Sequence, residues 1–459
     1  VFVRSKRNVP SASHRARHFA SRPSSDGFSG TFVMVGSAGY LRSLAAPEPV
    51  RYSSRMGTAL SDLTAEELFG VDNKRDPHPL YHRLRTEAPH WVEPEMGEMI
   101  LTRWADCEAV LRDPRWSSDP AHSQMDGDMR GAISDAGVRT LLFMDPPDHT
   151  RLRRLVSKAF TPRKIEQLRG HVGEIFDDLM SGWTGDEPFE VMSGLAYQLP
   201  VIVICELLGV PVDDRHQMEG WSSDASRLLD FAQIDEATAM KGMYAAMSFI
   251  NYFNGLFEAR RAEPQDDLLT ELIKAEEDGD KLTEEELRSI VLLLFVAGHE
   301  TTMNLIGNGL FALLTNRDQW ERLVADPSLV PSAVEEVLRY DGPVHITGRI
   351  ATTDLEVAGH VLPKGSNVVT LLAAANRDPE KFPDPDRFDV GRTDNQHLTF
   401  SHGIHYCLGA ALARLEGQVV FAKLAERYPD LQLAVDPDEV EYREHFVLRG
   451  LKALPVTRG

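Results

Sequence analysis

A single cysteine, Cys407, stands in the stretch FSHGIHYCLGAALAR, where a glycine-broken loop meets the start of an alanine-rich helix. Gly403 and Gly409 bracket the thiol and predict a tight loop whose backbone N–H groups point at the sulfur. Those donors, together with the positive end of the following helix, favour a thiolate. Phe400 is expected to shield one side of the sulfur, with His405 nearby as a donor. A thiolate held in this way suits axial ligation of a haem iron.

Other interpretations of Cys407 need different surroundings. A free cysteine is more often a small buried apolar side chain than a ligand. A disulfide or a zinc site needs further cysteines, but Cys107 and Cys205 are distant in the sequence. A cysteine protease needs a histidine base and an oxyanion hole, and no signature of that kind occurs.

A second polar group interrupts the apolar run IVLLLFV. Among the following residues, AGHETT from Ala297 to Thr302, the glycine and the two threonines are poor helix formers, and the threonine hydroxyls compete for backbone hydrogen bonds. The glutamate places an acid inside the otherwise apolar helix. In a purely structural interpretation, the threonine hydroxyls bond back to the preceding turn. In a functional one, Gly298 loosens the backbone, Thr301 turns its hydroxyl toward a pocket, and Glu300 passes protons.

The pattern from Phe400 to Gly409 resembles the haem-ligand signature of the cytochrome P-450 family at every fixed position. The resemblance implies haem b as cofactor, with Cys407 as its axial thiolate and metal ligand and Phe400 and Gly409 beside it. It makes Thr301 and Glu300 the catalytic residues for oxygen activation. Ala297 and Gly298 would then lie over the haem face opposite the cysteine.

The same resemblance gives roles to other motifs. Glu336 and Arg339 in SAVEEVLRYD share a helix face, and such a pair alone is usually a solvated surface contact. In the family this motif pairs with an arginine of a later Pro-rich stretch, which places Arg387 of ANRDPEKFPDPDRF in the network. The resemblance also implies that the haem propionates are bound by four cationic residues, namely His149, Arg153, Arg349 and His405.

Helical periodicity dominates the elements that must position these residues. Thr283 and Glu286 form a capping-box pattern, which predicts a helix from Thr283 to about Asn316. Strand-like segments are short and lie near residues 90–103, 349–372 and the C-terminus. We expect a mainly α fold with small β-sheets (α+β). The resemblance implies a single P-450 domain over residues 57–459, a triangular prism with haem between the long helix and the cysteine-loop helix.

The first residues differ from the rest in charge. Residues 1–55 carry nine Lys or Arg and only two Asp or Glu, although the whole chain has a net charge of −21. One interpretation is an organellar transit peptide. We favour a basic, disordered extension over residues 1–56, produced by a misassigned start codon.

Composition limits location and partners. Three dispersed cysteines favour a reducing compartment, here the cytoplasm, and the longest apolar run is about half a bilayer span. The acidic body argues against nucleic acid. We expect a monomer without a membrane anchor. No flavin or dinucleotide-binding fingerprint is recognisable, so the P-450 resemblance implies electrons from a ferredoxin or flavodoxin with its reductase.

The resemblance implies insertion of one atom of O2 into a hydrophobic small molecule such as a terpenoid, steroid, fatty acid or polyketide. The expected pocket comprises the 117–141 loop, the 228–243 segment, Leu293, Val296, Ala297, Val344, Ile346 and Phe446. One alternative is a peroxide-driven peroxygenase, which normally lacks the acid–threonine pair present here. Another is a non-catalytic haem sensor, which normally carries an output domain.

Overall fold

A computed structural model describes Leu60 and residues 63–459, apart from 94–96, 125–139, 159, 231–234, 278–279 and 446. The expected extension over residues 1–56 lies outside the described residues, so its assignment stays a prediction. Residues Met56–Gly459 form one unit of the chain, which carries all the elements described below.

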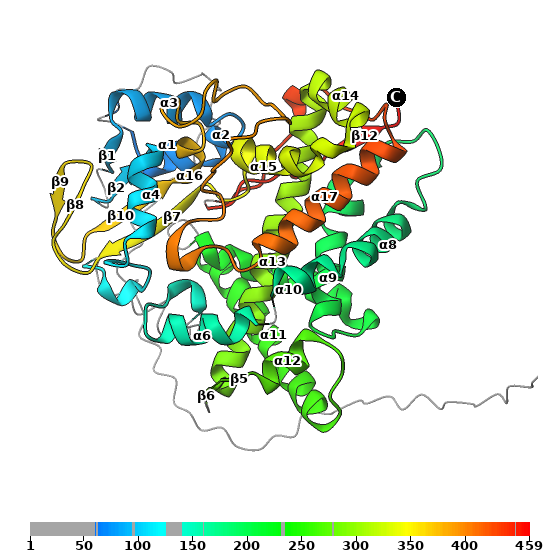
Figure 1. The fold of residues 1–459 in the computed structure, drawn as a ribbon, viewed down its shortest axis with the longest axis horizontal. Helices are drawn as coiled ribbons and strands as arrows, with labels where there is room; N and C mark the ends of the chain where they lie inside the picture. Colours follow the sequence, from blue (N-terminus) through cyan, green and yellow to red (C-terminus); the bar gives the residue numbers. More distant parts are fainter. Residues whose placement is uncertain are drawn as a thin grey trace, which may run out of the picture. The chain divides into compact units, whose positions relative to one another are not determined.

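Helices make up most of this unit, as the periodicity predicted (Figure 1). Apart from short 3₁₀ and π turns, they are α1 (Ala65–Phe69), α2 (Val71–Lys74), α3 (His78–Glu87), α4 (Trp104–Arg112), α6 (Asp148–Ser157), α7 (Pro162–Glu166), α8 (Arg169–Met180), α9 (Gln198–Leu207), α10 (Arg215–Ser226), α11 (Glu236–Ala262), α12 (Leu268–Lys274), α13 (Glu284–Thr315), α14 (Arg317–Ala325), α15 (Val330–Asp341), α16 (Leu372–Ala375) and α17 (Ala410–Arg427).

The main sheet and the β8–β9 pair lie at one side of the helical body, whereas β12 and the β5–β6 pair lie elsewhere (Figure 1). A five-stranded sheet has the order β1-β2-β10-β7-β3, and β2 and β10 are parallel while the other neighbours are antiparallel. Its strands are β1 (His90–Val92), β2 (Met99–Leu101), β3 (Trp116–Ser117), β7 (Ile346–Ala351) and β10 (Asn367–Leu371). The remaining strands are β4 (Phe189–Glu190), β5 (Glu276–Glu277), β6 (Asp280–Lys281), β8 (Leu355–Val357), β9 (His360–Leu362), β11 (Gln432–Leu433) and β12 (Pro455–Thr457).

The long helix α13 begins and ends where its sequence predicted. The Thr283 hydroxyl accepts from the Glu286 N–H at 3.2 Å, and the Glu286 carboxylate accepts from the Thr283 N–H at 2.8 Å. This capping box satisfies two donors that the helix start would leave free. The helix is long and apolar enough to cross a membrane, but 72% of its most apolar window is buried inside the fold.

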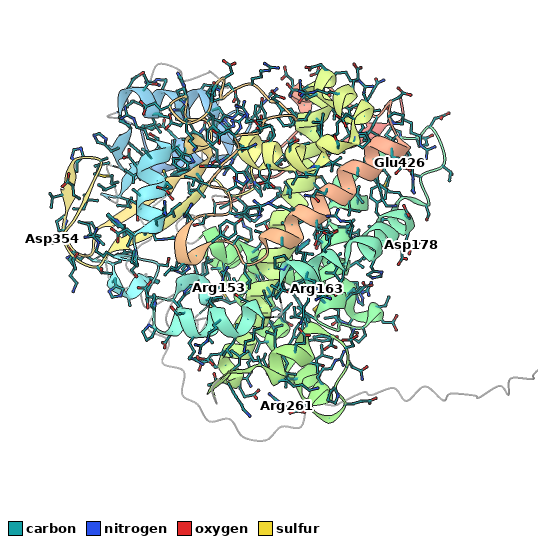
Figure 2. The ribbon with its side chains drawn as sticks, viewed as in Figure 1. Arg153, Arg163, Asp178, Arg261, Asp354 and Glu426 are labelled. Atoms are coloured by element: carbon teal, nitrogen blue, oxygen red, sulfur yellow. The ribbon has the colours of Figure 1, made fainter. Side chains whose placement is uncertain are left out.

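Helices α13, α15 and α17 meet at Gly309 of α13. A Cβ on Gly309 would lie 2.5 Å from the Phe421 ring of α17 and 2.9 Å from Val337 of α15, so only glycine permits this approach. The outer faces of α8 and α17 carry charge, as Asp178 and Glu426 show (Figure 2). The largest apolar cluster includes residues of α13, α15 and α17, and Cys407 packs against it.

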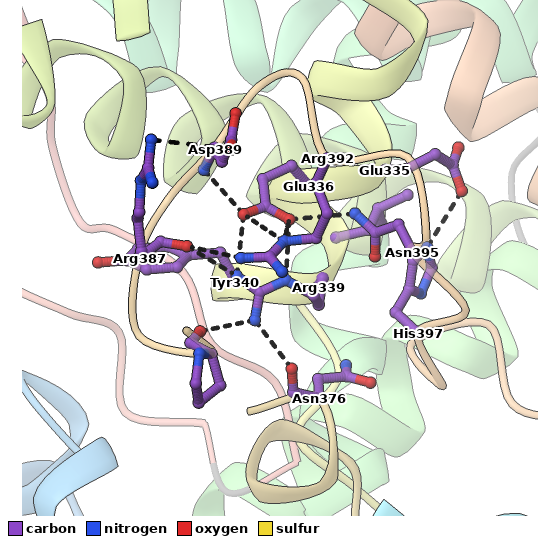
Figure 3. Close-up of polar contacts among 12 residues, drawn as sticks. Glu335, Glu336, Arg339, Tyr340, Asn376, Arg387, Asp389, Arg392, Asn395 and His397 are labelled. Carbon is purple, nitrogen blue, oxygen red and sulfur yellow. Dashed lines mark hydrogen bonds and ion pairs between the residues drawn. The ribbon is translucent and has the colours of Figure 1, made fainter. Parts of the chain in front are cut away.

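The Glu336 carboxylate on α15 is the centre of a buried polar network (Figure 3). Arg339 donates to it through two nitrogens at 2.8 and 2.9 Å, and neither side chain is exposed. Three further donors come from the loop after α16: the Asp389 N–H, the Asn395 amide and the Arg392 guanidinium. A buried charge needs this many donors to offset its loss of hydration.

Arg392, not Arg387, supplies the second guanidinium of this network. Arg392 approaches Glu336 at 3.1 Å with an 11% exposed side chain. Arg387 instead turns its carbonyl inward, where it accepts from Arg339 at 3.2 Å, and its side chain is 61% exposed. The prediction of an Arg387 side-chain contact was therefore wrong, because the backbone of that residue faces the network.

The neighbouring carboxylate, Glu335, holds the cysteine loop. Arg414 of α17 donates to it through two nitrogens at 2.7 and 2.9 Å, and His397 lies 3.2 Å away. The Arg414 guanidinium also lies 4.6 Å from the centre of the Phe400 ring and donates to the Tyr406 hydroxyl. Consecutive residues of one helix thus fix both the Pro-rich loop and the loop that carries Cys407.

We expect Arg392→Ala to lower the free energy of unfolding by about 3 kcal/mol, because it removes one partner of a buried charge. Arg387→Ala, which leaves the inward carbonyl in place, should change it by less than about 0.5 kcal/mol. Denaturant titration followed by circular dichroism measures both. Equal losses in the two variants would mean that the Arg387 side chain matters after all.

We expect stability to fall on acidification below pH 4.5. Burial works to raise the pKa of the Glu335 carboxyl, but hydrogen bonds from His397 and Arg414 outweigh it and hold this pKa at about 2. Because the folded-state pKa is depressed, the contribution is complete above the ordinary value and is lost as pH falls toward 2, by at most about 3 kcal/mol. Unfolding titrations of Glu335→Gln should lack this loss, whereas the exposed control Glu321→Gln should retain it.

Candidate active site

The loop before α17 presents the Cys407 thiol. The Cys407 N–H donates to the Phe400 carbonyl at 2.9 Å, which closes the loop. Gly403 has φ +68°, and a Cβ there would run into the Leu111 carbonyl oxygen, so the turn requires glycine. A Cβ on Gly409 would meet nothing within 4 Å, which leaves open space beside the sulfur.

The pKa of the Cys407 thiol is shifted in the direction opposite to the sequence prediction, which expected a favoured thiolate. Burial raises the pKa of the thiol, whereas hydrogen bonds from the Gly409 and Ala410 N–H groups and the charges of Arg153 and Arg414 lower it. The expected donors are present, but burial outweighs them. A bound metal cation would reverse this balance, because coordination deprotonates a thiol.

Four basic side chains converge near the sulfur. The rings of His149 on α6 and His405 lie 4.3 Å apart between centres. Arg153, one turn after His149, donates to the Tyr406 carbonyl at 2.6 Å and is labelled beside this loop in Figure 2. Burial lowers the pKa of both histidines, and the positive charge of Arg349 of β7 lowers it further. The structure thus brings together all four residues that the P-450 resemblance assigned to the propionates.

Three imidazole nitrogens of this cluster lack hydrogen-bond partners within the described part of the chain. Both His149 nitrogens and His405 Nε2 are buried and have no hydrogen-bond partner there. Arg349 is buried, and its guanidinium donates to the Thr347 hydroxyl and the Gly348 carbonyl. Among the described residues, Asp145 is the carboxylate whose charge acts on it, without an ion pair. Burial lowers the pKa of Arg349 to about 10 and that of His405 to about 3. Such a set of unpaired donors fits the carboxylates of an anionic ligand.

On α13, one face borders open space in the middle of the core. Ala297 is exposed and Leu293 and Thr301 are partly exposed, as are the adjacent Leu294 and Gly298, whereas Val296, His299 and Glu300 are buried. Leu293, Ala297 and Thr301 lie four residues apart and so share a helix face. A Cβ on Gly298 would meet only Ile204, at 3.9 Å. This spacing suits a flat ligand that lies against the helix.

The two polar residues of this helix are held by specific contacts. The Thr301 hydroxyl donates to the Ala297 carbonyl at 2.6 Å, which is the back-bonded arrangement, and keeps its lone pairs as acceptors. Glu300 is 1% exposed and forms an ion pair with Arg443 at 3.2 Å. Sequence analysis missed Arg443, because 143 residues separate it from Glu300 and no local pattern marks it.

The expected substrate-pocket residues lie in different surroundings. Val296 is buried and Val344 is partly buried, whereas Ile346 packs in the apolar cluster around β1 and α3. Phe446, most of the 117–141 loop and part of the 228–243 segment lie outside the described residues. The pocket therefore stays a prediction, supported at Leu293 and Ala297 by their exposure.

Comparison with known proteins agrees with this geometry. The sequence model of the family described as Cytochrome P450 matches residues 108–451. The chain is 45% identical to Vitamin D(3) 25-hydroxylase of Pseudonocardia autotrophica, over 86% of this chain and 96% of that protein. It is also 45% identical to the cytochrome P450 monooxygenase PikC of Streptomyces venezuelae, over 84% of this chain and 92% of that protein.

A solved structure confirms the fold. P450BioI, in complex with an acyl carrier protein ligated to hexadec-9Z-enoic acid, superimposes with a TM-score of 0.78. It is 37% identical and covers 84% of this chain and 99% of its own. Since the family's sequence model spans most of the chain and its relatives match along nearly their whole length, this protein belongs to the cytochrome P450 family.

Proposed function

We propose that this enzyme uses Cys407 to bind haem b and inserts one atom of O2 into a hydrophobic small molecule. The observation that carries the proposal is the set of unpaired buried donors beside the thiol, which fits the propionates of haem. His149, Arg153, Arg349 and His405 would bind those carboxylates. Haem, when bound, supplies the redox chemistry that activates dioxygen.

Helix α13 carries the residues that deliver protons to the site. The overall reaction, RH + O2 + 2 e⁻ + 2 H⁺ → ROH + H2O, consumes two protons per turnover. Glu300 accepts protons from the solvent side, and the Thr301 hydroxyl orients the water that delivers them. Its hydroxyl hydrogen is bound to the Ala297 carbonyl, so its lone pairs are free to accept from such a water.

The activities for which relatives are named guide the choice of substrate. Vitamin D(3) 25-hydroxylase is named for the hydroxylation of a large apolar molecule. We propose a substrate of similar character for this enzyme, hydroxylated or epoxidised at a carbon that reaches the face formed by Leu293 and Ala297. P450BioI was solved with a carrier-bound fatty acid, so a carrier-linked substrate is a second candidate.

Electrons would come from NAD(P)H through a separate ferredoxin or flavodoxin and its reductase, in the cytoplasm. We propose that Arg151, Arg154 and Lys158 of the α6 region form a docking patch on the cysteine side. Arg151 forms an ion pair with Glu286 of α13, so its charge is largely compensated.

We expect the reduced enzyme with CO to absorb near ~450 nm, as a thiolate ligand requires, and Cys407→His to shift the band to ~420 nm. Cys107→Ala and Cys205→Ala, which change buried cysteines elsewhere, should keep the band of the wild type. Difference spectra measure this directly. An unchanged band in Cys407→Ala would exclude this residue as the ligand.

We expect Thr301→Ala to reduce product per NAD(P)H by about tenfold or more, because proton delivery loses its acceptor. Thr315→Ala is a matched control, since Thr315 also bonds back to the helix, at the Phe311 carbonyl, but lies at the end of α13. Product, peroxide and NAD(P)H are quantified in one assay. Peroxide-driven turnover that exceeds the NAD(P)H-driven rate in the wild type would favour a peroxygenase instead.

A further inference from the structure

Three polar side chains follow one face of α13 at intervals of four residues: Glu300, Asn304 and Asn308. All three are buried, with exposures of 1% or less. They face the C-terminal hairpin, which we define as residues 441–452 apart from the undescribed residue 446. A bridge between Tyr442 and Leu451 and a hydrogen bond from the Arg443 N–H to the Gly450 carbonyl close this hairpin.

The hairpin lies along the helix in register with these side chains. Arg443 forms its ion pair with Glu300, and Gly450 lies against the Asn304 amide, where a Cβ would collide with it. Asn308 Nδ2 donates to the carbonyls of Asp341 and Arg449, each at 3.1 Å. Each of these three polar residues of α13 therefore contacts a different residue of the hairpin. We call this interface between α13 and the hairpin the seam.

Several polar atoms in this seam have no protein partner. Within the described residues, neither the oxygen nor the nitrogen of the Asn304 amide forms a hydrogen bond. The same holds for Asn308 Oδ1 and for Arg449 Nη1, although Arg449 is only 4% exposed. Leaving such groups dry in an apolar core is costly, and internal water is the usual partner of buried polar atoms.

The spacing suits a water file. Side chains four residues apart on a helix are separated by about 6 Å at their Cβ atoms. Two hydrogen bonds of about 2.8 Å each span nearly the same length, so one water joins neighbouring members. At the far end, Arg449 Nη2 donates to the carbonyl of Arg75, whose side chain is 54% exposed.

We propose that the seam between α13 and the C-terminal hairpin holds a file of internal water that carries protons from the surface near Arg75 to Glu300, with Asn304 as its positioning residue. The proposal rests on the proposed function, since it supplies the protons that Glu300 passes on. A proton enters at the surface, each water hands one on and receives one, and one proton arrives at the Glu300 carboxylate. No electron moves in this step.

The test compares three variants of the holoenzyme. Asn304→Leu has a similar volume but removes both polar atoms, and Met303→Leu controls for repacking of the next, fully buried residue of α13. Glu300→Gln reports on the acid itself. For each, the solvent deuterium isotope effect on product formation, the product per NAD(P)H and the substrate-induced spin-state shift are measured.

We expect Asn304→Leu to raise the solvent isotope effect and lose product per NAD(P)H, as Glu300→Gln does, while substrate Kd from the spin-state shift stays unchanged. Met303→Leu should behave as the wild type. If Asn304→Leu matches Met303→Leu while Glu300→Gln is impaired, the water file is wrong and the proposed function stands. If Glu300→Gln is also unimpaired, the proton role of Glu300 fails with it.

A second measurement does not depend on activity or on the folding of a variant. A high-resolution crystal structure of the wild-type holoenzyme should show ordered waters within hydrogen-bond distance of the Asn304 amide and Arg449 Nη1. A dry seam in that structure would overturn the proposal.

Discussion

The buried Glu336 carboxylate is the interaction on which the rest of the architecture depends. It receives donors from its own helix and from three residues of the loop that follows α16. One charge therefore joins segments more than 50 residues apart. Losing hydration would make this charge destabilising if any of its main partners were absent. Beside it, Glu335 extends the same support to α17 and to Phe400 and Tyr406. The position of Cys407 is thus set from behind by two consecutive carboxylates.

This rigid support matters because the site in front of it holds buried polar groups that lack partners when no ligand is bound. Burial favours the neutral thiol at Cys407, and within the described residues both nitrogens of His149 and Nε2 of His405 have no hydrogen-bond partner. Both deficits are corrected by one kind of ligand, which brings a cation to the sulfur and anions to the basic cluster. Only a ligand that carries both a cation and anions stabilises the thiolate and the basic cluster together. This double requirement makes binding specific.

Local patterns in the sequence were sufficient where the structure depends on local physics. The capping box at Thr283, the glycines around Cys407 and the Glu336–Arg339 spacing each act within a few residues, and the structure has them as predicted. Contacts between distant segments could not be read in this way. Arg443 reaches Glu300 only through the course of the C-terminal hairpin, and the choice of Arg392 over Arg387 depends on which way a loop carbonyl points.

The parallel pairing of β2 with β10 has a consequence for how the chain reaches this state. Met99 lies opposite Val368, so the sheet gains its central neighbour only after about 270 further residues have been made. Pairing across so long a loop is slow, because closure entropy is lost before the contacts form. During synthesis, the edge of β2 that pairs with β10 stays unpaired until β10 has been made. We expect this exposed edge to make the nascent chain a substrate for chaperones.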